Sequence, residues 1–86
     1  MILEVYTIYD KAVKAYMQPF YVRARGEALR SFTEAVNDPA KPFGKYAVDY
    51  LLVALGSFDD SSGVFSSGEP VRVVGAEEVL VTPDPV

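Results

Sequence analysis

The chain opens with a segment, Ile2 to Tyr9, that is rich in β-branched and aromatic residues. Such a composition is typical of a β-strand. Side chains of a strand alternate between two faces, and here both faces receive apolar residues. The pattern therefore predicts a strand that is central in its sheet or covered on both sides.

A second strand is predicted after an ambiguous stretch. Residues 10–19 are compatible with a short helical turn over Lys11–Tyr16, which Pro19 would end. From Phe20 to Arg25 apolar and polar residues then alternate. In such a strand Phe20, Val22 and Ala24 face inward, whereas Tyr21, Arg23 and Arg25 face outward.

The clearest helical periodicity spans Gly26 to Asn37. Leu29, Phe32 and Val36 are spaced three and four residues apart, so they form one apolar stripe of a helix. Pro39 ends the helix, because the residue before a proline is driven out of the α region.

The second half of the chain predicts another strand, Tyr50 to Phe58, which is apolar on both faces. The run 59–63 has the composition of a turn, and residues 64–66 would return as the second strand of a hairpin. Residues 68–70 are expected to break the chain before a short extended piece, 71–74. Residues 76–80 fit a helical turn or a strand equally well, and 82–86 are expected to form a flexible tail.

These elements predict an α+β fold of ββαββ type: a small antiparallel or mixed sheet with one helix packed on one face. Residues 1–81 would form a single small domain. One helix does not cover a four-stranded sheet, so the other face must be closed by curvature, by loops or by a second subunit. For this reason, and because aromatic residues are abundant, we expect a homodimer.

The amino-acid composition excludes several kinds of catalytic and metal-binding site. The 86 residues include no cysteine, histidine or tryptophan, which excludes Cys/His zinc sites, disulfides, cysteine nucleophiles and Ser-His-Asp triads. The acidic turn 59–63 lacks the ligand spacing of an EF-hand, and Gly44-Lys45 lacks the glycine spacing of a phosphate-binding loop. We therefore expect no enzymatic activity, no metal and no cofactor.

Charge is distributed unevenly around a net value of −4. Residues 1–45 carry seven basic and five acidic side chains, whereas residues 46–86 carry one basic and seven acidic ones. This polarity is compatible with an anionic partner of the first half, or with an ordinary solvated surface. The sequence predicts neither a signal peptide nor a membrane span, because its longest apolar run, 50–55, is far too short.

The strongest candidate site lies on the predicted second strand. Tyr21, Arg23 and Arg25 would stand in a row, about 7 Å apart. Arginines that follow phosphates and rings that stack on bases bind single-stranded nucleic acid. Neighbouring residues extend this candidate surface: Lys11, Lys14, Tyr6, Tyr9 and Tyr16. The alternative interpretation is a solvated strand face whose arginine stems cover apolar area.

An ordered set of short segments resembles the small nonstructural protein of gokushovirus-like Microviridae, which are single-stranded DNA phages. The resemblance spans roughly residues 1–66 and rests on the segments 2–12, 15–16, 19–20, 36–39, 43–45, 49–50 and 56–60, with Gly26, Ala28, Arg30 and Phe32 in the helix. It implies a nonstructural protein in the cytoplasm of an infected bacterium, absent from the mature virion and without an established catalytic residue.

Two functional hypotheses follow. The first is a non-enzymatic protein that binds single-stranded DNA and assists phage genome replication or packaging. The second is a protein–protein interaction module, either a host-directed effector or an assembly factor, in which the acidic half and the spare aromatic residues form the interface.

Overall fold

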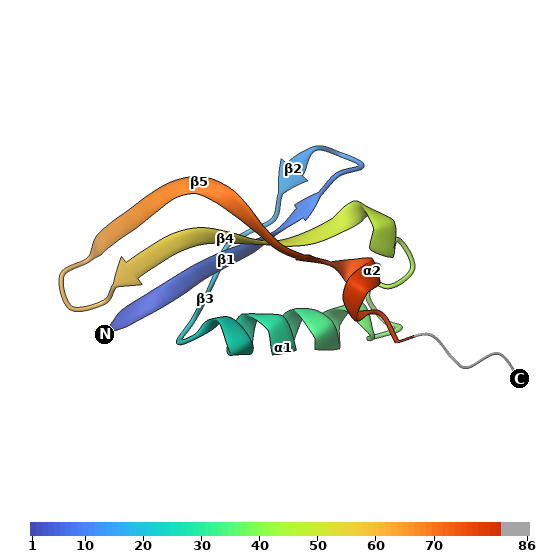
Figure 1. Ribbon diagram of the computed structural model, residues 1–86, viewed down its shortest axis with the longest axis horizontal. Coiled ribbons are helices and arrows are strands. Elements are labelled where there is room, and N and C mark those ends of the chain that lie inside the picture. Colours follow the sequence, from blue (N-terminus) through green and yellow to red (C-terminus); the bar gives the residue numbers. More distant parts are fainter. Residues whose placement is uncertain (82–86) are drawn as a thin grey trace, which may run out of the picture.

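A computed structural model describes residues 1–81 as a strongly twisted, curling antiparallel sheet with a helix beneath part of it (Figure 1). The chain is mostly sheet. The elements are β1 (Ile2–Asp10), β2 (Ala15–Tyr16), β3 (Phe20–Val22), α1 (Arg25–Val36), a 3-10 turn (Ala47–Asp49), β4 (Tyr50–Asp59), β5 (Val64–Gly75) and α2 (Ala76–Val79).

Strand β1 is central, as its apolar faces predict. It pairs with β4 along one edge and with both β2 and β3 along the other, and every pairing is antiparallel. Tyr9 lies opposite Tyr16, but Tyr6 lies opposite Phe20, so the β2–β3 side holds one extra residue. The two short strands are thus one strand interrupted by a bulge, where the Thr7 hydroxyl donates a hydrogen bond to the Met17 carbonyl at 2.6 Å. This pairing resolves the ambiguity of residues 10–19 in favour of a turn and a strand.

Strand β5 corrects the predicted break at residues 68–70, because the strand continues through them to Gly75. Ala54 pairs with Val71 and Gly56 pairs with Ser67, so residues 68–70 stand opposite Leu55 alone. Gly68 and Pro70 therefore belong to a bulge within β5 and do not end the strand. Proline has no N–H to donate, and β5 is the edge strand of the sheet, where such a residue is tolerated.

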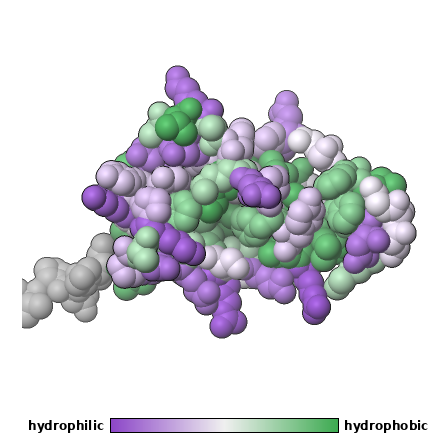
Figure 2. All heavy atoms as spheres, turned by 180° about the vertical axis from the view of Figure 1, so that it is seen from behind, coloured by the Kyte–Doolittle hydropathy of each residue, from purple (hydrophilic) through white to green (hydrophobic). Residues whose placement is uncertain are grey.

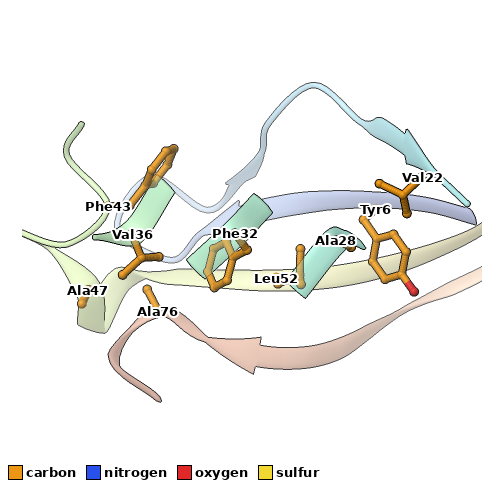
Figure 3. Packing of buried hydrophobic residues seen from close by; sticks show 9 residues of the cluster. All are labelled: Tyr6, Val22, Ala28, Phe32, Val36, Phe43, Ala47, Leu52 and Ala76. Carbon is orange, nitrogen blue, oxygen red and sulfur yellow. The ribbon is translucent and has the colours of Figure 1, made fainter. Parts of the chain in front are cut away.

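Helix α1 confirms the predicted helix, with its apolar stripe facing the sheet. Ala28, Phe32 and Val36 are buried in a cluster that also takes side chains from β1, β4 and α2 (Figure 3). The helix covers only part of the sheet, and the β4–β5 hairpin extends past its N-terminal end (Figure 1). The description of one helix on one face therefore fits only loosely.

The C-terminal side of α1 is tied to α2 by Asn37. Its amide nitrogen donates to the carbonyls of Thr33 at 2.8 Å and Val79 at 3.0 Å, and its amide oxygen accepts from the Val81 N–H at 2.8 Å. On the other side of α2, Arg72 of β5 pairs with Glu78. Of residues 76–80, which the sequence left open between helix and strand, residues 76–79 thus form a short helix held on both sides.

The flexible tail expected over residues 82–86 lies outside the described residues. Between residues 1 and 81, no helix is both long and apolar enough to cross a membrane.

Candidate nucleic-acid interface

The structure does not bring the eight candidate residues into one row. Tyr21 lies in β3, Arg23 follows the last residue of that strand, and Arg25 is the first residue of α1. Four others lie around the β1–β2 turn: Tyr9, Lys11, Lys14 and Tyr16. Tyr6 lies in the core.

Tyr6 is not placed to stack on a base, because its side chain is 2% exposed and forms one end of the core (Figure 3). Its hydroxyl donates a hydrogen bond of 2.5 Å to a Glu4 carboxylate oxygen. Burial, and then this hydrogen bond, raise the pKa of Tyr6, while the Arg25 guanidinium acts in the opposite direction. Both faces of β1 are apolar in the sequence, so the alternation did not predict that Tyr6 lies on the face that α1 covers.

The row of Tyr21, Arg23 and Arg25 on one strand is wrong, because β3 ends at Val22. Ala24 is the extended residue that precedes α1, and the Glu27 carboxylate accepts a hydrogen bond from the Arg23 N–H at 3.0 Å. This acidic side chain in the first turn fixes the chain entering the helix, so Arg25 belongs to α1. Alternation over six residues is too short to separate a strand from a strand that turns into a helix.

Tyr21 is instead part of a cluster of three rings from three strands, which we call the ring cluster: Tyr21, Phe58 and Phe65. The ring centroids lie 5.8 Å apart between Tyr21 and Phe58, 6.4 Å between Tyr21 and Phe65, and 4.7 Å between the two phenylalanines. Tyr21 is 47% exposed and Phe65 is 58% exposed. These rings therefore present aromatic surface to solvent rather than to the core.

The ring cluster lies on the sheet face opposite α1. Tyr21 pairs with Val5, and Phe58 pairs with Leu3, whereas the alternate residue Tyr6 points to the helix. An open apolar cavity of about 270 Å³ adjoins it, with Val5, Tyr21 and Phe65 among its walls and residues 55–57 and 66–67 of the hairpin along its floor. Apolar surface also gathers at the end of the molecule that holds the N-terminus and the β4–β5 turn (Figures 1 and 2).

A second pair of rings lies on the same face, farther along β1. Tyr9 and Tyr16 are paired across β1 and β2, with ring centroids 4.6 Å apart, and Tyr16 is 52% exposed. Tyr9 follows Val5 by four residues, which places the two groups of rings about 13 Å apart along the strand. The exposed Lys11 and Lys14 lie in the turn beside this pair.

Charges near the ring cluster are partly neutralised within the chain. The Met1 ammonium group lies 2.7 Å from an Asp60 oxygen and 3.8 Å from an Asp59 oxygen, and its hydrogen bond to Asp60 raises its pKa. The backbone N–H of Ser61 lowers the pKa of Asp59. Arg23, two residues after Tyr21, forms no ion pair within residues 1–81. An exposed cation outside any ion pair of residues 1–81 therefore follows Tyr21 closely in the chain, while the acidic turn carries its own counter-charge.

Sequence reasoning missed Phe58 and Phe65 as functional candidates. The signal that could have found them is their placement on either side of the predicted turn 59–63, where a hairpin pairs them. Linking this pair to Tyr21 required the order of the strands, because β1 lies between β3 and β4.

Comparison with protein families matches residues 3–79 of the chain to the family described as Phage ORF5 protein. Comparisons with curated proteins and with solved structures gave no match. The match covers β1 through α2, which includes the whole sheet, the ring cluster and the core. The chain therefore belongs to the Phage ORF5 protein family.

Proposed function

We propose that this phage protein is a non-enzymatic, single-stranded nucleic-acid-binding protein that assists genome replication or packaging in phages of the gokushovirus-like Microviridae. It would act in the cytoplasm of the infected bacterium and be absent from the mature virion. The observation that carries the proposal is the ring cluster, whose exposed Tyr21 and Phe65 stand on the open face of the sheet.

Base stacking on exposed rings is the sequence-tolerant part of single-strand binding. The ring cluster and the Tyr9–Tyr16 pair lie on one face, so successive bases of one strand have two places to stack. The cavity between Tyr21 and Phe65 adds an apolar recess. The face thus combines exposed ring surface with a recess that a base could enter.

Cations at both ends of this face supply the phosphate contacts. Arg23 follows the ring cluster, and Lys11 and Lys14 lie beside the other pair of rings. Neutralising phosphates releases counterions, which makes binding sensitive to salt. An acidic protein binds an anionic strand when its local surface is positive, so the net charge of −4 is compatible with this function.

Fluorescence anisotropy with a labelled dT oligonucleotide tests the proposal. Three phosphate contacts predict that affinity falls about twentyfold between 50 and 200 mM salt, from a slope of about −0.7 per contact. Replacing Tyr21 and Phe65 together by alanine should weaken binding about tenfold or more, because stacking on each base contributes strongly. Tyr46→Ala, which removes an exposed ring of the loop between α1 and β4, is the matched control and should bind normally. Absence of binding at low salt contradicts the proposal.

A protein interface is the second candidate, favoured by the apolar side chains that the β4–β5 hairpin and the N-terminal strand expose. Ile2, Val64 and Val71 are 58–60% exposed, and β5 offers a free sheet edge. A second copy of the chain is the partner that we expect, and a host protein or assembly partner is the alternative. Light scattering at micromolar concentration should give twice the monomer mass of 9.4 kDa, whereas a 9.4 kDa particle alone contradicts the homodimer. Stoichiometric co-purification of another protein without nucleic acid would favour the interaction module.

A further inference from the structure

A second cavity opens on the other side of the sheet, where α1 begins and no longer covers the strands. It has a volume of about 400 Å³ and is open to solvent. Three charged side chains from three elements line it: Glu4 of β1, Arg25 of α1 and Glu69 of the β5 bulge. The Tyr6 hydroxyl also reaches it, and Ala54 and Val71 are among its apolar walls.

These side chains form no direct ion pair with one another, although Glu4 and Arg25 both act on the Tyr6 hydroxyl. No ion pair within residues 1–81 involves Glu4, Arg25 or Glu69. Tyr6 donates its hydroxyl proton to Glu4, and the Arg25 guanidinium lies beside the same hydroxyl oxygen. The cavity thus offers the remaining guanidinium donors of Arg25 beside the acceptors of the Glu4 and Glu69 carboxylates.

This mixture disfavours simple ions. Two carboxylates oppose a phosphate, and Arg25 opposes a lone cation. No group of three or more acidic side chains in the described part of the chain is placed to hold a metal ion. The complementary ligand carries acceptors and donors on adjacent edges and an apolar or aromatic face that can lie against Ala54 and Val71.

Guanine has this pattern more fully than the other bases. Its O6 and N7 accept hydrogen bonds, and arginine donates to both of them in a bidentate pair. Its N1–H and N2 amino group are donors for two carboxylates, whereas adenine and cytosine each have one amino group and no ring N–H, and thymine has a single N–H between two carbonyls. We propose that this cavity binds a guanine base of the single strand that lies on the ring cluster, an inference that rests on the proposed function.

The topology allows one strand to reach both places. Leu55 and Gly56 line both cavities, one on each side of the sheet. β5 is the edge strand, and its bulge at residues 68–70 is the rim of the guanine cavity. A nucleic-acid strand that passes over this edge therefore connects the ring cluster with the cavity.

Anisotropy titrations with four labelled oligonucleotides test the inference: dT12, and dT12 with one central dG, dC or deoxyinosine. A single dG prevents quadruplex formation, and deoxyinosine lacks only the N2 amino group. We expect the dG oligonucleotide to bind about tenfold tighter than dT12, with dC and deoxyinosine between them. Arg25→Gln and Glu69→Gln should each remove most of this preference while dT12 binding changes less than twofold. Glu34→Gln, an exposed carboxylate elsewhere on α1, should retain the preference.

The two proposals fail in distinguishable ways. Equal affinity of the wild type for all four oligonucleotides overturns the guanine cavity and leaves the ring cluster standing. A dG preference that survives in both Arg25→Gln and Glu69→Gln also overturns it, because the preference then arises elsewhere. No binding of any oligonucleotide at low salt overturns the proposed function and this inference together.

Discussion

Gly56 of β4 lies against the backbone of Ser66 in β5: a Cβ atom at position 56 would come within 2.1 Å of the Ser66 carbonyl oxygen. Its φ of +145° is also a conformation that residues with side chains rarely adopt. Only glycine allows the two strands to approach this closely beside the β5 bulge. The lack of a side chain at position 56 therefore allows the hairpin that carries Phe58 and Phe65 to form.

Gly56→Ala should destabilise the protein severely, because both the backbone conformation and the close approach exclude a side chain. We expect a loss of about 3 kcal/mol or more in the free energy of unfolding, measured by urea denaturation. Gly26→Ala is the control, since a Cβ at that position of α1 meets nothing within 4 Å. It should leave stability unchanged or raise it by up to about 1 kcal/mol. Equal stability of the two variants would contradict the described approach of β4 and β5.

Asn37 should act as the anchor of residues 79–81, because its side chain makes hydrogen bonds to Thr33, Val79 and Val81. Asn37→Ala removes all three and should cost about 1–3 kcal/mol of stability. Asn37→Asp keeps the acceptor for the Val81 N–H and loses both donors. Amide hydrogen exchange at Val81 should therefore accelerate strongly in the alanine variant and less in the aspartate variant. Unchanged exchange in both variants would exclude this anchoring role.

Tyr6 makes stability depend on alkaline pH. Burial, then the hydrogen bond to Glu4, raise its pKa in the folded protein above that of the unfolded chain, which is about 10. Below pH 10 both states hold the proton, and the contribution to stability is complete. As pH rises from there toward the folded pKa, the unfolded chain ionises first and stability is lost.

Tyr6→Phe should reduce this alkaline loss, measured by urea denaturation between pH 8 and 11. Part of the dependence should persist, since burial also raises the pKa of Tyr50. At neutral pH the variant should lose about 1 kcal/mol with the hydrogen bond to Glu4. An alkaline limb identical to that of the wild type would show that Tyr6 has no part in it.

Local patterns predicted the elements better than their ends. The apolar stripe of α1 and the apolar runs of β1 and β4 were confirmed, because burial on one or both faces leaves a periodic signal. The end of β3 and the continuation of β5 were not predicted. β3 ends early because the Glu27 carboxylate accepts a hydrogen bond from the Arg23 N–H, and β5 continues beyond Pro70 because it stays paired with β4. These contacts link different elements, so the pattern of apolar and polar residues within one segment does not predict them.

In the candidate site, too, local patterns predicted single residues but not the contacts between strands. Tyr21 was found because it alternates outward from a short strand, and it is exposed as expected. Its partners Phe58 and Phe65 belong to the other side of β1, so only the sheet order brings the three rings together. Tyr6 was misplaced because an apolar strand with two covered faces does not indicate which face the helix occupies.

The central claim, that a single nucleic-acid strand lies on the ring cluster, is tested most directly by NMR. Titrating the isotope-labelled protein with dT12 at low salt should shift the backbone amides of residues 21–23, 57–58 and 64–67, and then those around Tyr9 and Tyr16. Amides of the exposed side of α1, such as that of Arg30, should stay in place. An unchanged spectrum, or shifts confined to α1 and the loop around Tyr46, would contradict the claim.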